Sequence, residues 1–212
     1  MTPADPFAPL PLFPFPLFSS VIGGFEEHRE PLLNEILDLR RRFPGIVRSN
    51  RDAWHSGDEF LAHRSEHVAW MLQKVTKFAR LTLGRYYQNW ATADLTLASC
   101  WANVLEPGGW NAPHHHFPCH WSGVFYVSAG RAGIAPGDSG GMIEFLNPTP
   151  WQSVYGQGGN SAFAPKNGLT FLFPASLYHF VHPHTTDEPR VSIAYNLNVA
   201  PKAAVGARQS GS

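Results

Sequence analysis

The sequence has few cysteines, few charged residues and no long apolar run. Its two cysteines, Cys100 and Cys119, are too few for a disulfide framework, and a chain of 212 residues does not need one to fold. Charged residues make up only 15% of the chain, and 16 basic residues balance 16 acidic ones. We therefore expect neither nucleic acid nor an anionic membrane surface as a partner. No stretch reaches the roughly 20 consecutive apolar residues that are needed to cross a bilayer.

The apolar beginning of the chain, residues 9–22, lacks the features of a signal peptide. The first basic residue, Arg29, comes after it, and the segment is interrupted by Pro9, Pro11, Pro14 and Pro16. We expect a cytoplasmic protein in which this segment is extended or forms an edge strand, where proline is tolerated. An edge near Phe13–Phe18 could pair with a second copy of the chain and form a homodimer.

Helical and strand-like patterns occupy different halves of the chain. Apolar residues recur at helical spacing in residues 29–42 and again in residues 58–84. From residue 95 onward, short β-branched and aromatic runs alternate with Pro/Gly turns such as residues 106–109. These runs are Leu95–Leu105, Ser122–Ser128, Gly141–Leu146, Leu169–Phe173, Leu177–Val181 and Arg190–Val199.

These patterns predict a mostly β protein with N-terminal helices. We expect one domain over residues 1–200, with helical support at about 26–92 and a β barrel or sandwich at about 95–200. Residues 201–212 are small and polar, and we expect them to form a flexible tail.

Seven of the 11 histidines lie between residues 114 and 184, in the β half of the chain. Side chains alternate along a strand, so His114 and His116 should share one face and His115 should point the other way. Two imidazoles at this spacing can meet one metal ion. The best candidate for a third ligand is His179, in the penultimate strand. Three protein ligands would leave coordination positions open for O₂ and a substrate.

Arg190 and Ser192 begin the last predicted strand and share one of its faces. Together they could hold a carboxylate, because the guanidinium fork matches its two oxygens and the hydroxyl adds a hydrogen bond. A non-catalytic alternative is a structural metal site in a β barrel, closed by four protein ligands, with His115 or Cys119 as the fourth.

The order of these motifs resembles the double-stranded β-helix oxygenases that use Fe(II), 2-oxoglutarate and O₂, and more narrowly a bacterial branch of them. The resemblance is carried by Leu12–Pro16, Pro44–Asn50, Trp54–Ser56, Trp101–Asn103, Pro113–His116, Ser122–Tyr126, Gly141–Phe145, Phe173–Pro174, His179 and Arg190–Asn196. It implies a jelly-roll, cupin-like core with covering helices. It also implies that decarboxylation of 2-oxoglutarate is coupled to the oxidation, in the first place hydroxylation, of a small-molecule substrate.

The resemblance also implies roles for individual residues. His114 and His179 would be iron ligands, and Arg190 would bind the far carboxylate of 2-oxoglutarate. The residues implied beside the cosubstrate are Ser192, Tyr126, Asn103 and Asn196. The resemblance also makes Trp54 and His55 candidates for a loop on the substrate side. From the sequence itself, His120 could line the mouth of the pocket or lie at the surface, and Trp121 could shield the site from water or belong to the barrel core.

One position departs from the pattern of the wider superfamily, which has Asp or Glu two residues after the first histidine. This chain has His116 there, so we predict a face of three histidines, His114, His116 and His179. The less favoured alternative is a carboxylate from Glu106 or Glu144. Three-histidine iron also occurs in cupin-type dioxygenases that need no 2-oxoglutarate, and this is the rival enzymatic interpretation.

Overall fold

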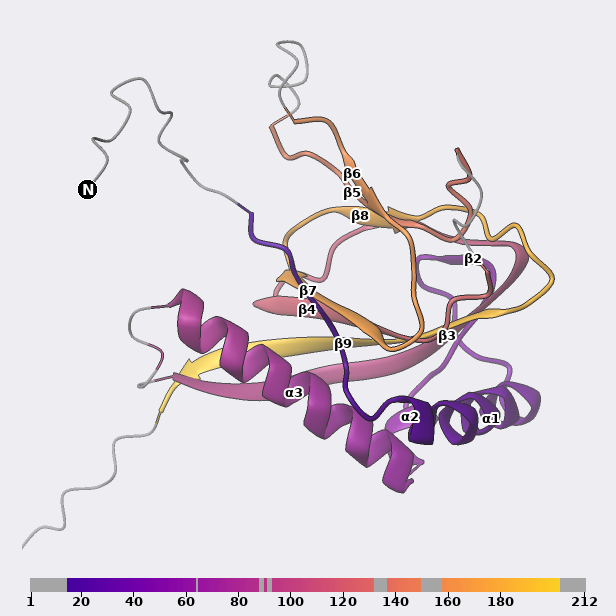
Figure 1. The fold of residues 1–212 in the computed structure, drawn as a ribbon, viewed down its shortest axis with the longest axis horizontal. Helices are drawn as coiled ribbons and strands as arrows, with labels where there is room; N and C mark the ends of the chain where they lie inside the picture. Colours follow the sequence, from indigo (N-terminus) through magenta and orange to yellow (C-terminus); the bar gives the residue numbers. More distant parts are fainter. Residues whose placement is uncertain are drawn as a thin grey trace, which may run out of the picture.

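The computed structural model describes residues 15–63, 65–87, 90, 93–131, 137–149 and 158–202 (Figure 1). Its helices are α1 (Glu26–Arg42), α2 (Glu59–Ala62) and α3 (Glu66–Tyr86). Its strands are β1 (Phe18–Val21), β2 (Asn50–His55), β3 (Ala93–His114), β4 (Trp121–Ser128), β5 (Ile143–Phe145), β6 (Ser161–Phe163), β7 (Leu169–Pro174), β8 (His179–Val181) and β9 (Arg190–Pro201). None of the helices in these described ranges is long and apolar enough to span a membrane.

The strands form a single antiparallel sheet in the order β1-β7-β4-β9-β3-β8-β5-β6, with β2 paired to β3. The long strand β3 joins two layers, because its residues 93–105 pair with β9 whereas Asn111 and His114 pair with β8. We call β1, β7, β4, β9 and the first part of β3 the major layer, and β8, β5 and β6 the minor layer. In Figure 1 the helices cover one side of the major layer and the minor layer lies on its other side. This confirms the predicted mostly β fold, a double-stranded β-helix with covering helices.

Side-chain alternation gives the two faces of the major layer different characters. On β9, Val191, Ile193, Tyr195 and Leu197 face the helices and belong to a large apolar core, together with residues of α1 and α3 such as Leu32, Ile36, Met71 and Val75. The intervening residues Arg190, Ser192 and Ala194 line a cavity on the opposite face. A second, smaller apolar core lies between the layers and consists of Val124, Tyr126, Ile143, Phe145, Phe171, Phe173 and Leu177.

Two local predictions from the sequence are wrong. The helix expected over residues 58–84 is two helices, because Ser65 is extended (φ −93°, ψ 154°) and caps α3 by accepting a hydrogen bond from Val68 N–H at 3.0 Å. The expected turn at residues 106–109 continues β3, where a Cβ on Gly109 would meet Asp52 O at 2.7 Å.

The first helix begins close to the prediction, at Glu26 instead of residue 29, and ends at Arg42 as expected. The beginning of the chain is described only from residue 15, and β1 lies at one edge of the sheet, paired with β7. Pro9, Pro11 and Pro14 lie outside the described residues, and so do residues 203–212 of the expected flexible tail. Pairing of this edge with a second copy stays a prediction.

Candidate metal centre

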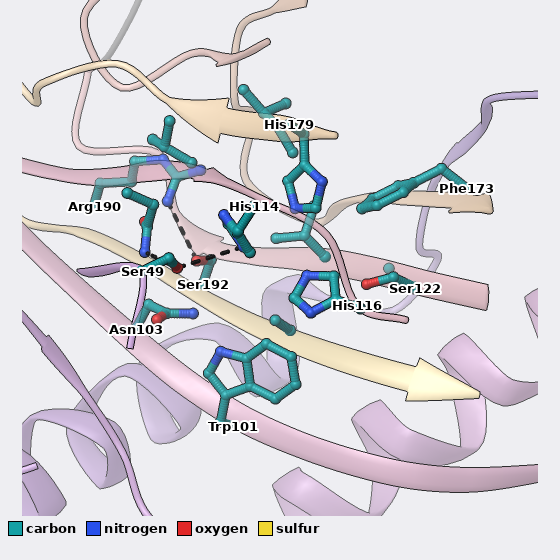
Figure 2. A pocket seen from close by; sticks show the side chains of 16 residues that line it. Ser49, Trp101, Asn103, His114, His116, Ser122, Phe173, His179, Arg190 and Ser192 are labelled. Carbon is teal, nitrogen blue, oxygen red and sulfur yellow. Dashed lines mark hydrogen bonds between the residues drawn. The ribbon is translucent and has the colours of Figure 1, made fainter. Parts of the chain in front are cut away.

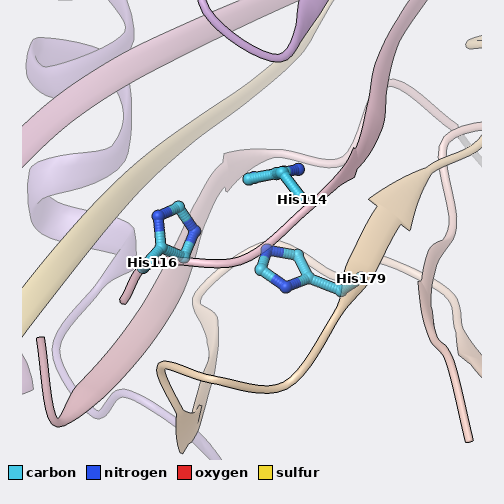
Figure 3. A group of neighbouring side chains, drawn as sticks. All are labelled: His114, His116 and His179. Atoms are coloured by element: carbon cyan, nitrogen blue, oxygen red, sulfur yellow. The ribbon is translucent and has the colours of Figure 1, made fainter. Parts of the chain in front are cut away.

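Three histidines from different parts of the chain meet in one group (Figure 3). His114 ends β3 and is paired with His179, which begins β8; His116 follows two residues after His114. The centroids of the three rings are 4.4 to 5.1 Å apart. One nitrogen from each ring lies within 4.8 Å of the others, so the group could hold a metal ion.

The alternation of side chains, which predicted this group of histidines, continues beyond His114, the last residue of β3. His115 points away, is exposed and packs its ring 4.8 Å from that of Tyr178. His116 is fixed by its backbone N–H, which donates to Ala175 O at 2.7 Å in the turn between β7 and β8. The chain after β3 is therefore tied to the same turn that leads to His179.

Hydrogen bonds and burial prepare these imidazoles for a metal. Nδ1 of His114 donates to Ala112 O at 2.7 Å, and Nδ1 of His179 donates to Leu177 O at 3.0 Å, since a carbonyl oxygen can only accept. The Nε2 lone pair of His179 is then free for coordination, and that of His114 accepts a long hydrogen bond from Ser49 Oγ at 3.4 Å, which a bound metal ion would replace. Burial lowers the pKa of all three histidines, that of His116 to about 3, and the neighbouring imidazoles lower it further. All three are neutral, which is the form that binds metal.

The three histidines open on a narrow inner cavity with about 460 Å³ of empty space, part of it continuous with solvent (Figure 2). In the view of Figure 2, Arg190 and Ser192 lie on one side of the histidines, and Ser122 and Phe173 lie on the other. Trp101, Asn103, Ser49 and Asn111 also line the cavity.

The Arg190 guanidinium is the charged group of this cavity, and its side chain is 1% exposed. Its Nε donates to Gly141 O at 2.9 Å, its Nη1 donates to Ser192 Oγ at 3.3 Å, and its central carbon lies 4.9 Å from the ring centroid of Tyr126. No Asp or Glu among the described residues forms an ion pair with it. Desolvation lowers the pKa of Arg190, but an arginine stays cationic in proteins. Because a buried charge without an opposite charge is costly, an anion bound beside Arg190 would relieve a cost that no described residue offsets.

Other polar atoms around the inner cavity also lack partners. Asn103 Oδ1 and Ser122 Oγ line it, are buried and form no hydrogen bond with any described residue. The hydroxyl of Tyr126 is also buried, and the neighbouring Arg190 guanidinium opposes the rise in its pKa that burial causes. Buried polar groups are usually hydrogen-bonded, so these atoms are suited to contact a bound molecule.

The carboxylates that could have replaced His116 lie elsewhere. Glu106 forms an exposed ion pair with Arg40, which lowers the pKa of the Glu106 carboxyl. Glu144 accepts hydrogen bonds from His182 at 2.7 Å and from Asn160 at 2.8 Å. Within the described ranges, the metal-capable group therefore consists of histidines alone.

A second, outer cavity adjoins the first and has about 940 Å³ of empty space, part of it open to solvent. Both cavities are lined by Ser49, Trp101, His114 and His116, so they meet at the histidines. His55, one of the residues expected at the substrate, lines the outer cavity.

The other three residues expected at the substrate line neither cavity. Trp54 donates its indole N–H to Phe43 O and, like Trp121, belongs to the apolar core under the helices. His120 is exposed, and its Nδ1 accepts a hydrogen bond from Val199 N–H. His120 and Trp121 thus have the alternative placements, at the surface and in the core, and a substrate contact for Trp54 stays a prediction that its place in the core does not support. The alternation of side chains along a strand could have shown that Trp121 faces the core, because its neighbour Ser122 faces the inner cavity.

Of the four residues expected beside the cosubstrate, two line the inner cavity and two do not. Ser192 and Asn103 line the inner cavity, and Tyr126 packs against Arg190. Asn196 is buried one row further along β9, where its Nδ2 donates to Ser99 Oγ at 3.0 Å, and it lines neither cavity. Ser49 and Trp101 were missed as site residues, although both lie in segments that carry the family resemblance.

The fold and site define a class of protein: a double-stranded β-helix with a group of metal-capable histidines and a buried arginine in its interior. Residues 99–196 match the protein family described as "Putative 2OG-Fe(II) oxygenase". In sequence over this range and in fold, the chain resembles the 2-oxoglutarate/Fe(II) oxygenases. Among curated proteins, no relative matches the chain.

Solved structures of this kind share the fold at low sequence identity. A prolyl-4-hydroxylase from Pseudomonas putida has a TM-score of 0.60 and 14% identity, covering 86% of this chain and 92% of its own. The α-ketoglutarate-dependent epimerase SnoN of nogalamycin biosynthesis has a TM-score of 0.63 and 15% identity, covering 92% and 86%. HygX from Streptomyces hygroscopicus, with nickel, 2-oxoglutarate and hygromycin B bound, has a TM-score of 0.57 and 13% identity, covering 89% and 83%.

Proposed function

We propose that the chain is an oxygenase that binds Fe(II) through His114, His116 and His179 and uses 2-oxoglutarate to oxidise, by hydroxylation, a small-molecule substrate. The observation that carries the proposal is the placement of the buried, counterion-free Arg190 in the same cavity as the three histidines. The family match over residues 99–196 supports the same chemistry.

The donor set suits the proposed iron. Three neutral imidazoles bind a divalent cation without cancelling its charge, so the cavity then contains a dication and a guanidinium. A dianion with one carboxylate at each end complements both charges, and 2-oxoglutarate is such a dianion. Three protein ligands also leave positions open for the keto acid and O₂.

The residues of the chain would divide the remaining tasks. Arg190 would bind the carboxylate remote from the metal, Ser192 would orient it with its hydroxyl, and the buried hydroxyl of Tyr126 would donate a further hydrogen bond. Trp101 and Phe173 would exclude water beside the histidines. Fe(II) with 2-oxoglutarate and O₂ supplies an oxidation that converts 2-oxoglutarate to succinate and CO₂ and transfers the second oxygen atom to the substrate.

The two rival interpretations make different demands on the site. A cupin-type dioxygenase without 2-oxoglutarate gives the buried charge of Arg190 no task. A structural metal site needs a fourth protein ligand. His115 points away from the group, and neither it nor Cys119 belongs to the metal-capable group of the described residues.

The test is anaerobic addition of Fe(II) and 2-oxoglutarate, followed by visible absorption spectroscopy. We expect a weak charge-transfer band that needs both components, because iron and the keto acid must form a chelate in the same site. Succinate formation under O₂ is the second measurement. A protein that binds iron but gives no band at saturating 2-oxoglutarate would favour the cupin-type alternative.

A further inference from the structure

The outer cavity contains a histidine that the metal group does not use. His55, at the end of β2, is 8% exposed and lines this cavity with Ser56, Trp101 and His116. It is not part of the metal-capable group. Its position beside the open side of the histidines raises the question of what its ring binds.

The orientation of the His55 ring is fixed by two contacts. Nδ1 donates to Ser56 O at 2.6 Å, and the ring stacks on the indole of Trp101 with centroids 5.4 Å apart and planes 8° from parallel. Ser56 is itself held to β3, where its Oγ and its N–H both bond to the backbone of Ala102. The ring is therefore held by β2 and β3 together.

The free nitrogen of this ring is a hydrogen-bond acceptor without a partner. Because the proton of the neutral ring is on Nδ1, Nε2 carries a lone pair. No residue among those described donates a hydrogen bond to it. Burial lowers the pKa of His55, and the nearby Arg48 lowers it further, so the imidazole stays neutral at physiological pH.

The charged groups of the outer cavity lie at its rim. Arg48 and Asp58 are exposed, whereas His55, Ser56 and Trp101 form a wall with no charge. A charged group bound against this wall would lose its hydration and would find no opposite charge in the wall itself, which is costly. A neutral group that donates a hydrogen bond would instead be satisfied by Nε2.

We propose that His55 Nε2 accepts a hydrogen bond from a hydroxyl or amide N–H of the primary substrate, which makes neutral alcohols or amides the substrate class of the outer cavity. This inference rests on the proposed function, because it takes the side of the histidines that faces away from Arg190 to be the substrate side. His55 is then a specificity-determining residue, separate from the residues that bind 2-oxoglutarate.

Matched small molecules test the inference on protein loaded with Zn(II), a diamagnetic substitute for iron, and 2-oxoglutarate. The probes share one ring: cyclohexanol and cyclohexanecarboxamide donate hydrogen bonds, methoxycyclohexane does not, and cyclohexanecarboxylate is an anion. Affinities and the ¹⁵N resonance of His55 Nε2 are measured by NMR, since this resonance moves upfield when the nitrogen accepts a hydrogen bond.

We expect the two donors to bind about fivefold more tightly than the ether or the carboxylate, the effect of one neutral hydrogen bond, and to move the Nε2 resonance. His55→Leu should remove this preference, and His55→Gln, which keeps an acceptor, should retain most of it. Equal binding of alcohol and ether, no binding of either donor, tightest binding of the carboxylate, or a preference that persists in His55→Leu would each overturn the inference. The wild-type comparison decides the matter even if a variant does not fold.

The visible band with Fe(II) and 2-oxoglutarate separates this inference from the proposed function. A normal band without donor preference overturns only the role of His55. An absent band overturns the proposed function, and the probes are then compared on metal-free protein, where the preference still reports on His55.

Discussion

Successive residues of β9 face two different environments, the apolar core under the helices and the inner cavity. Val191, Ile193, Tyr195 and Leu197 face the helices in the large apolar core, each 0% exposed, and the hydroxyl of Tyr195 is hydrogen-bonded to Thr170 Oγ1 at 3.0 Å. Arg190 and Ser192 are almost equally buried, at 1% and 2%, but face a cavity with unpaired polar atoms. Burial alone therefore does not distinguish the core from the site. What distinguishes them is whether each polar group has a partner.

The helix-side face can stabilise the fold because it buries apolar surface, and its one hydroxyl, that of Tyr195, has hydrogen-bond partners. The cavity face does the reverse: a guanidinium without a counterion and several orphaned polar atoms destabilise the unliganded protein. Such a face is retained where a ligand supplies the missing partners. The two faces should therefore respond differently to substitution, in stability on one side and in ligand affinity on the other.

The largest effect is expected on the helix side. Ile193→Ala removes a fully buried side chain from the apolar core and should lower the free energy of unfolding by about 2–5 kcal/mol. Chemical denaturation measures this change. Ser192→Ala, one residue away on the cavity face, is the matched control and should change stability far less. Equal losses would remove the distinction between the faces.

The next largest effect is expected at the metal group. His179→Ala deletes one of the three proposed ligands, and we expect Fe(II) affinity to fall at least about 100-fold. Removing a residue that only hydrogen-bonds to a metal ligand typically lowers metal affinity by about 10- to 100-fold, and the loss of a ligand itself should be larger. Anaerobic isothermal titration calorimetry measures it. His182→Ala, three residues away and bonded to Glu144 outside the group, should bind iron normally. Iron binding that survives His179→Ala would refute the three-histidine site.

The third effect separates the cosubstrate from the metal. Arg190→Met keeps much of the side-chain volume but removes the charge, so affinity for 2-oxoglutarate should fall about 10- to 100-fold, the value of charge-assisted hydrogen bonds. Fe(II) affinity should remain within a few-fold of wild type. Arg131→Met, which breaks an exposed ion pair with Glu188, is the control and should change neither. A parallel loss of iron in Arg190→Met would show that Arg190 acts on the fold.

The smallest effect is expected for the hydroxyl beside Arg190. Ser192→Ala removes the hydroxyl that accepts from Arg190 Nη1, and the affinity for 2-oxoglutarate should fall about fivefold. Ser192→Thr keeps a hydroxyl and should lose less. An affinity that Ser192→Ala leaves unchanged would remove this residue from the cosubstrate site while leaving Arg190 in it.

The sequence was sufficient for features that depend on strand alternation. The shared side of His114 and His116, and that of Arg190 and Ser192, follow from a period of two, and the structure brings all four residues to one cavity. His179 pairs with His114 because β3 passes from one layer to the other. The family resemblance implied that these two histidines meet, whereas the alternation within either strand does not determine it.

Features decided by long-range packing could not be read from the sequence. The helix over residues 58–84 is broken at Ser65, whose hydroxyl also donates to Glu35 of α1, 30 residues away. Trp54 faces the helix-side core and its neighbour His55 faces the outer cavity, a choice set by the pairing of β2 with β3. Aromatic residues next to a motif were for this reason poor guides to the substrate side.

The central claim is that one ligand bridges the histidines and Arg190. Isothermal titration calorimetry of 2-oxoglutarate into anaerobic protein, with Fe(II) and without metal, tests it most directly. We predict at least about tenfold tighter binding with Fe(II), and by linkage an equal tightening of Fe(II) by 2-oxoglutarate. Equal affinity with and without the metal, in protein shown to contain iron, would contradict the account.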